Sequence, residues 1–160
     1  MKIGTKSLLF GMHPVLWHPY MVYKAWKHLY GRPNWKELLC IIIHDWGYWG
    51  KPNIDGKEGI MHPKLGALIA GRLLGKEYYF LCAGHSRSFA EEFGFETSKL
   101  CWADKLSFTF EPKRFYLLRA KLSGELKQAK MDHLRGESDS EWFDNTCEYF
   151  KKLVQEQVKI

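Results

Sequence analysis

The apolar residues of this chain recur at the spacing of helix faces, and no segment shows the convincing alternation of a half-buried strand. Pro19 precedes the segment 20–31, which closes at Gly31, and Pro63 precedes a segment that closes near Gly75. Proline in the first turn and glycine just past the last are typical of helices. The same pattern predicts further helices over 34–45, 76–87, 88–94, 99–108 (with Thr97 or Ser98 as its cap), 115–126 and from Ser140 onward. The predicted fold class is therefore all-α.

Three isoleucines at the end of segment 34–45 run directly into His44 and Asp45. The isoleucine run alone is compatible with a buried strand, but the length of the segment, with Trp35, Lys36 and Glu37 before the run, favours a helix. Because this helix is apolar on nearly every side, we expect it to be central in the fold. Its end would then present two polar side chains at a dry but accessible place.

The segment 47–59 is predicted to be a loop, because it contains four glycines and one proline. Loops of this length are often functional. We expect it to form a lid or a specificity loop over whatever His44 and Asp45 hold. Trp46, Tyr48 and Trp49 are candidates for stacking on a base, although packing in the core is an equally good interpretation.

The length of 160 residues predicts a single domain, 1–160, that is large enough for its own core. The net charge of +6 and the isoelectric point of about 9.1 favour anionic partners: nucleotides, phosphate esters, nucleic acid or an acidic membrane surface. Basic residues crowd the stretch from Lys113 to Arg135. This stretch is either a solvated helix face or a rim that attracts phosphate.

Four cysteines are present without any CxxC pair, which does not favour a zinc ribbon or a thioredoxin-like site. Each cysteine lies among apolar residues, so we expect buried free thiols in a reducing compartment. The first residues lack a signal-peptide core, and no stretch reaches the roughly 18 apolar residues that span a bilayer. A cytoplasmic protein without a membrane partner is expected.

Candidate metal ligands lie at the ends of the predicted helices. His18 begins one helix, His44 and Asp45 end the next, His62 begins a third and His85 ends a fourth. Asp104 lies within segment 99–108. Four imidazoles and two carboxylates form the nitrogen and oxygen donor set that suits a divalent cation.

The separations of these residues fit helical hairpins, because each span from His18 to His44 and from His62 to His85 holds roughly two helices. Asp45 could bridge two ions, which lie about 3.5–4 Å apart in typical two-metal sites. His13 competes with His18 as the first ligand, and we prefer His18 because Pro19 starts its helix. We assign no site role to His13, His28 and His133.

The ordered set His18, His44-Asp45, His62, His85 and Asp104 in a helical context resembles the HD-domain superfamily of metal-dependent phosphohydrolases. The resemblance runs from about His18 to Asp104, roughly half of the chain. It implies a helical bundle of the HD-domain type. In that family the first histidine, the HD pair and the last aspartate hold one metal, and two further histidines mark the two-metal branches, such as the HD-GYP phosphodiesterases.

Two departures from that pattern bear on the substrate. Many two-metal members read HDIGK, whereas Tyr48 stands here in place of the lysine and the nearest lysine is Lys51. No GYP-type motif follows His85, which does not favour cleavage of cyclic-di-GMP.

The resemblance implies a hydrolase for a nucleotide-like phosphate ester, with two divalent ions from among Mn, Fe, Mg, Ni and Co. Such ions polarise the phosphoryl oxygens and activate a water molecule. Asp45 would bridge or ligate the ions, and Lys51, Arg87 and Lys105 are candidates to neutralise charge on the phosphate. The expected partner is a small anionic substrate, and nucleic acid is a weaker expectation.

Two other functions stay open. The same ligand set resembles the HD-fold mixed-valent di-iron oxygenases, which use dioxygen to cleave carbon–carbon or carbon–phosphorus bonds. A nucleotide-binding or adaptor protein with a vestigial site is the third possibility, and the complete ligand set argues against it.

Overall fold

The computed structural model describes residues 1–132 and 136–158, so the predictions for His133 and Arg135 lie outside the described residues. Within that part of the chain the structure is helical and contains no strand, which confirms the all-α prediction. The helices are α1 (Ile3–Phe10), α2 (Trp17–Tyr30), α3 (Trp35–Ile43), η1 (Trp46–Tyr48), α4 (Lys57–Ile60), α5 (Pro63–Leu74), α6 (Lys76–Ala83), α7 (Arg87–Phe93), α8 (Lys99–Ser107), η2 (Phe108–Phe110), α9 (Lys113–Ser123), α10 (Glu125–Asp132) and α11 (Asp139–Val158).

Most of the predicted helix boundaries are observed. α2 ends at Gly31 with φ of 82°, and α5 begins at Pro63 and ends before Gly75 with φ of 107°. α3 ends at Ile43, directly before His44 and two residues short of the predicted end. Its start is stabilised by a capping box, in which the Asn34 side chain accepts from the backbone N–H of Glu37 and the Glu37 side chain accepts from the N–H of Asn34.

Two local expectations are wrong, and the start of the chain forms a helix, α1, that was not predicted. The segment expected to be a loop, 47–59, contains most of η1 and the start of α4. The helix expected over 115–126 is interrupted, because Gly124 adopts the left-handed conformation with φ of 85° and separates α9 from α10. A left-handed residue cannot continue a right-handed helix.

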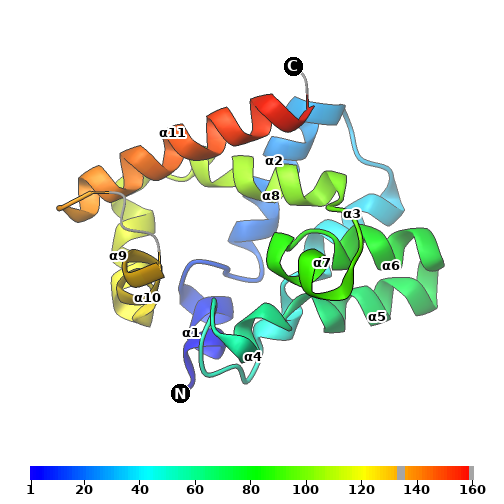
Figure 1. The fold of residues 1–160 in the computed structure, drawn as a ribbon, viewed down its shortest axis with the longest axis horizontal. Coiled ribbons are helices and arrows are strands. Elements are labelled where there is room, and N and C mark those ends of the chain that lie inside the picture. The colour runs from blue at the N-terminus through cyan, green and yellow to red at the C-terminus, as the bar shows by residue number, and fades with distance from the viewer. Residues whose placement is uncertain (133–135, 159–160) are drawn as a thin grey trace.

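Two hydrophobic clusters organise the described residues. The first joins α2, α3, α5, α6 and α8, with Trp26, Ile41, Ile43 and Leu100 almost fully buried. The second joins α1, α9, α10 and α11 around Trp142. In Figure 1, α5 and α6 lie side by side, α11 crosses α8, and α9 and α10 lie at the opposite end from α5 and α6. All helices that carry the predicted ligands belong to the first cluster.

The expectation of buried free thiols is confirmed for three of the four cysteines. Cys40, Cys82 and Cys101 are buried free thiols, whereas Cys147 is a free thiol that is only half-buried.

Gly66 allows α5 to approach the end of α3. A Cβ atom at this position would lie 2.6 Å from the carbonyl oxygen of Ile43 and 3.0 Å from the Cα atom of His44. We therefore expect Gly66→Ala to lower the free energy of unfolding by about 1–3 kcal/mol, the usual effect of overpacking. Urea unfolding followed by circular dichroism would measure it. Lys64→Ala, an exposed position of the same helix, is the control, and an equal effect of both changes would contradict this account.

Candidate metal centre

Six predicted ligands come together at the ends of four helix segments and on one helix face. His18 lies in the first turn of α2, His44 and Asp45 follow α3, His62 precedes α5 and His85 follows α6. Asp104 lies within α8. The four histidines and Asp45 are buried, with exposed fractions of 0–7%. The geometric part of the sequence prediction is therefore observed: the scattered polar side chains share one buried place.

Three of the four histidines are held in one orientation by the backbone. The Nδ1 atom of His44 lies 2.8 Å from the carbonyl oxygen of Ile41, that of His62 lies 2.7 Å from Gly59, and that of His85 lies 2.5 Å from Cys82. A carbonyl oxygen only accepts, so each Nδ1 carries the hydrogen and donates it. In the neutral ring the Nε2 lone pair is then free to bind a cation, the arrangement that carbonyl partners give to metal-bound histidine.

Asp45 lies at the centre of these imidazoles. Its Oδ2 atom is 3.2 Å from the Nε2 atoms of both His18 and His44. Its Oδ1 atom is 3.2 Å from Nε2 of His85 and 3.5 Å from Nε2 of His62. One carboxylate thus presents each of its oxygens to a different pair of histidines, as a residue that bridges two ions must.

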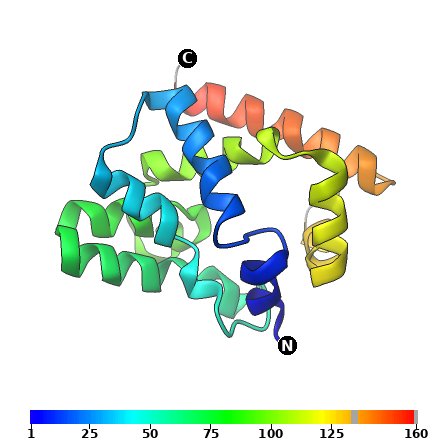
Figure 2. The ribbon, with the colours of Figure 1, turned by 180° about the vertical axis from the view of Figure 1, so that it is seen from behind.

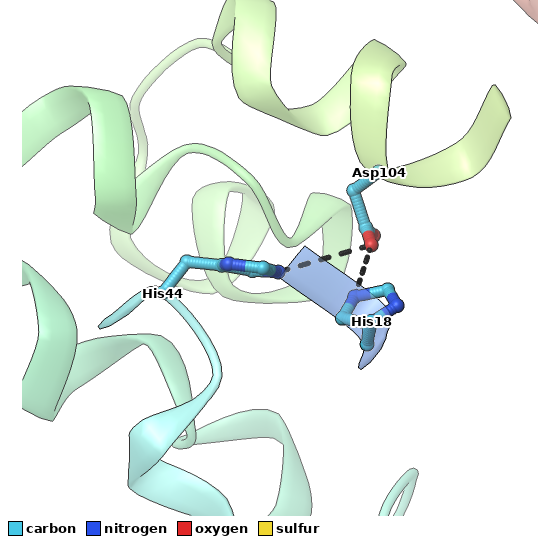
Figure 3. Close-up of side chains that lie close together, drawn as sticks. All are labelled: His18, His44 and Asp104. Atoms are coloured by element: carbon cyan, nitrogen blue, oxygen red, sulfur yellow. Dashed lines mark ion pairs between the residues drawn. The ribbon is translucent and has the colours of Figure 1, made fainter. Parts of the chain in front are cut away.

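Asp104 completes the His18 and His44 side of the centre. Figure 3 shows both imidazoles pointing toward its carboxylate from different helix segments. Its Oδ1 atom is 3.1 Å from Nε2 of His18 and 3.9 Å from Nε2 of His44. Its Oδ2 atom accepts a hydrogen bond of 3.0 Å from the ammonium group of Lys105. Lys105 therefore orients the aspartate and adds positive charge beside it.

Several ligand atoms are buried without a hydrogen bond. Nε2 of His18, Nε2 of His44 and Oδ2 of Asp45 have no hydrogen-bond partner among the described residues. Such atoms are costly unless a partner is bound. The Nε2 atoms of His62 and His85 are 2.9 Å apart although both Nδ1 atoms carry the hydrogen, so two lone pairs face each other. The groups His18/His44/Asp104 and His44/Asp45/His85 could each hold a cation, and the donor set fits a divalent ion.

The charges at the centre divide it into two halves. Burial by itself lowers the pKa of His18, but attraction to the nearby carboxylates of Asp104 and Asp45 outweighs it and raises the pKa to about 9. Burial likewise opposes the attraction of Asp45 for His44, whose pKa rises to about 10. Burial lowers the pKa of both His62 and His85. Without a cation, the first pair is therefore protonated and the second pair is neutral near pH 7.

Both carboxylates remain ionised. Burial opposes the ionisation of Asp45, but the charges of His44 and His13 hold its pKa well below the usual range. Burial has the same effect on Asp104, and the ammonium group of Lys105 is the main factor that keeps its pKa low. Both carboxylates thus present anionic oxygens when a cation arrives, while His18 and His44 must each give up a proton.

The centre opens into a cavity of about 740 Å³. Arg87 at the start of α7 and Lys105 on α8 line it, together with the ligands His18, Asp45, His62, His85 and Asp104. Lys51 is not among the lining residues. Its backbone carbonyl accepts from the N–H of Gly4, and its Cβ atom lies beside Gly4 in α1. The structure therefore brings Arg87 and Lys105 to the cavity but not Lys51.

Sequence reasoning assigned no role to His13, which also lines this cavity. Its ring centroid is 5.2 Å from that of His18, and its Nδ1 atom is 2.8 Å from Oγ of Ser7 and 3.5 Å from Oε1 of Glu125. Glu125 is fully buried and accepts from the backbone N–H of Met12 at 2.7 Å. The signal missed in the sequence was this buried carboxylate, which comes from a helix more than 100 residues away.

Segment 47–59 contributes part of the cavity wall. Tyr48 is buried and its ring is stacked on His62, with centroids 4.0 Å apart. Tyr48, Ile54 and Asp55 line the cavity, whereas Trp46 and Trp49 are 40% and 64% exposed and do not line it. Of the three aromatic candidates, only Tyr48 reaches the cavity, and its stacking partner there is a histidine.

The basic stretch that begins at Lys113 is largely paired with acids in the described residues. Lys113 contacts Asp144, Lys121 and Lys130 contact Asp139, and Arg119 forms a buried ion pair of 2.8 Å with Glu111. These pairs connect α9 and α10 to neighbouring elements. They favour a structural role for the stretch over a rim that attracts phosphate.

A scan against protein-family models, a search of curated proteins and a search of solved structures found no match to this chain. Among the described residues, no helix has the length and apolar character that crossing a membrane requires.

Proposed function

We propose that the protein is a metal-dependent phosphohydrolase of the HD-domain type, acting on a small nucleotide-like phosphate ester. The observation that carries the proposal is the Asp45 carboxylate, whose two oxygens each face a separate pair of imidazole Nε2 atoms at 3.2–3.5 Å. His18, His44, Asp45 and Asp104 would hold one ion, and Asp45, His62 and His85 the other. Divalent ions bound there supply a Lewis acid for the phosphoryl oxygens and lower the pKa of a water molecule.

The surrounding residues would bind and orient the substrate. Lys105 and Arg87 line the cavity on the side of α7 and α8, where their positive charges favour a phosphate group beside the ligands. Tyr116, Trp142 and Phe150 line it farther along the chain, on α9 and α11. Aromatic surface of this kind suits the base of a nucleotide. The volume of about 740 Å³ is in the range of cavities that enclose a small organic molecule.

The substrate class is tested by hydrolysis assays on protein reconstituted separately with Mn, Fe, Mg, Ni and Co. A panel of nucleoside mono- and triphosphates, cyclic dinucleotides and simple phosphate esters would be followed by phosphate release and chromatography. We expect turnover of a nucleotide with at least one of these metals. Metal binding without turnover of any member of the panel would contradict the proposed activity while leaving the metal centre intact.

The oxygenase is the second candidate, because four imidazoles and two carboxylates also suit a pair of iron ions. It predicts consumption of dioxygen and an electron paramagnetic resonance signal of a mixed-valent pair in the iron-loaded protein under mild reduction. Hydrolysis under strictly anaerobic conditions supports the phosphohydrolase instead.

Replacing the basic side chains that line the cavity should weaken substrate binding. We expect Arg87→Ala and Lys105→Gln each to raise KM for the best substrate of the panel by about 10- to 100-fold, because each removes a charged group beside the phosphate. Steady-state kinetics at saturating metal would measure this. Lys51→Ala is the matched control and should leave KM unchanged, since Lys51 does not line the cavity. A larger effect at Lys51 than at Arg87 would contradict the assignment.

A further inference from the structure

Apolar side chains are exposed along one side of α9. Phe115, Leu118 and Leu122 follow one another at helical spacing and are 46%, 56% and 65% exposed. The opposite side of the same helix buries Tyr116 and Ala120. A helix that is apolar on its outer side as well as its inner side has a surface left without a partner within the chain.

The stripe continues onto the N-terminal helices. The ring of Phe115 contacts that of Trp17 with centroids 5.6 Å apart, and Arg119 donates to the carbonyl oxygen of Gly11. Leu9, Phe10, Leu16 and Tyr20 are exposed next to these contacts, and Leu16 is 85% exposed. In Figure 2, α1, α2 and α9 lie on the side that faces the viewer. We call the exposed residues Leu9, Phe10, Leu16, Tyr20, Phe115, Leu118 and Leu122 the α1–α9 face.

The segments that form this face contain no acidic residue. Residues 1–36 hold six basic side chains and no aspartate or glutamate, and residues 112–124 hold four more. Lys113, Lys121 and Arg119 contact acids from outside these segments. Arg114 is exposed on α9 within the stripe, and Lys2 is exposed next to α1. The face thus combines exposed apolar side chains with the positive charges of Arg114 and Lys2.

We propose that the α1–α9 face binds an acidic lipid surface. Leucine and phenylalanine side chains would enter the boundary between headgroups and acyl chains, while the basic residues contact anionic headgroups. Trp17 and Tyr20 are residue types enriched at this depth. A helix lying on a membrane needs no spanning segment, so the lack of one in the described chain does not oppose the proposal.

The charge and apolar character of the face favour an acidic lipid surface over a second copy of the chain or a nucleic acid. Two copies joined through the face would bring equal positive charges together, which costs free energy. Nucleic acid would satisfy the basic residues but not the exposed leucines. An acidic lipid surface accommodates both features, and it does so independently of the metal centre.

Co-sedimentation of the full chain with vesicles tests the proposal. The vesicles would be phosphatidylcholine alone or phosphatidylcholine with roughly 30 mol% phosphatidylglycerol. We expect binding to be about tenfold or more stronger to the anionic vesicles and to weaken with salt. The double change Leu118→Ser and Leu122→Ser should abolish it. Leu68→Ser and Leu73→Ser, at similarly exposed positions of α5, form the control and should retain it.

Folding of each variant is checked by circular dichroism, and Arg114→Gln provides a milder change if the double variant unfolds. It should reduce the preference for anionic vesicles without changing helix content. Equal binding to both kinds of vesicle overturns the proposal. Vesicle binding that survives the double change Leu118→Ser and Leu122→Ser also overturns it. Self-association that appears in place of vesicle binding and is lost in the α9 variants overturns it in favour of a dimer. Binding to an oligonucleotide but not to vesicles overturns it in favour of a nucleic-acid partner.

Discussion

Replacing Asp45 by asparagine should leave the protein folded while lowering its metal content and reducing turnover by a factor of about 1,000 or more. Both oxygens of Asp45 face imidazole Nε2 atoms, two on each side, at 3.2–3.5 Å. Asparagine keeps the shape of the side chain but replaces one oxygen with an NH₂ group, which cannot bind a cation. It also removes the negative charge that faces both halves of the centre, so the binding of both ions should be weakened or lost together.

Metal content after reconstitution and removal of free ions would be measured by mass spectrometry, and turnover by the same substrate panel. His28→Ala is the matched control, because His28 is an exposed histidine of α2, the helix that also carries His18. An Asp45→Asn protein with normal metal content would refute the bridging role. Loss of metal combined with unchanged biological function of the protein in cells would instead favour a binding protein over an enzyme.

The convergence of the ligands could be predicted because turn signals fixed where each helix ends. Pro19, Pro63 and Gly75 frame the helices that carry His18 and His62 and precede the one that ends near His85, and all are observed at helix ends. About two helices lie between His18 and His44 and between His62 and His85, so each pair of ligands lies on the same side of the first hydrophobic cluster. Local backbone chemistry and hydrophobic spacing were enough for this part.

Tertiary packing decided what could not be predicted. Lys51 and Tyr48 are both close to Asp45 in the sequence, but Tyr48 turns inward to stack on His62 whereas Lys51 packs beside α1. α1 itself was not predicted as a helix, since it is only eight residues long and has no side-chain cap at its start. His13 lines the cavity beside Glu125, from the distant α10, which accepts a hydrogen bond from the backbone N–H of Met12. No spacing in the sequence reports contacts of that kind.

Metal affinity on the His18 side of the centre should rise steeply with pH. Burial lowers the pKa of His18 and of His44, but attraction to the Asp45 and Asp104 carboxylates outweighs it and raises the two pKa values to about 9 and about 10. Below these values both imidazoles carry a proton that a bound ion must displace. Each released proton increases the apparent affinity about tenfold per pH unit, so two protons give up to about 100-fold per unit. The affinity increases as pH rises and levels off above the higher pKa.

The His62 and His85 side should behave differently, because burial lowers both pKa values and leaves these rings neutral near pH 7. Calorimetric titration with Mn²⁺ at about pH 6.5, 7.5 and 8.5 should therefore resolve one class of site that depends strongly on pH and one that hardly does. Buffers with different ionisation enthalpies count the protons released. His18→Gln should lower that count by about one, since it removes one of the two displaced protons. Equal, flat affinities for both ions across this range would show that His18 and His44 are already neutral before the metal binds.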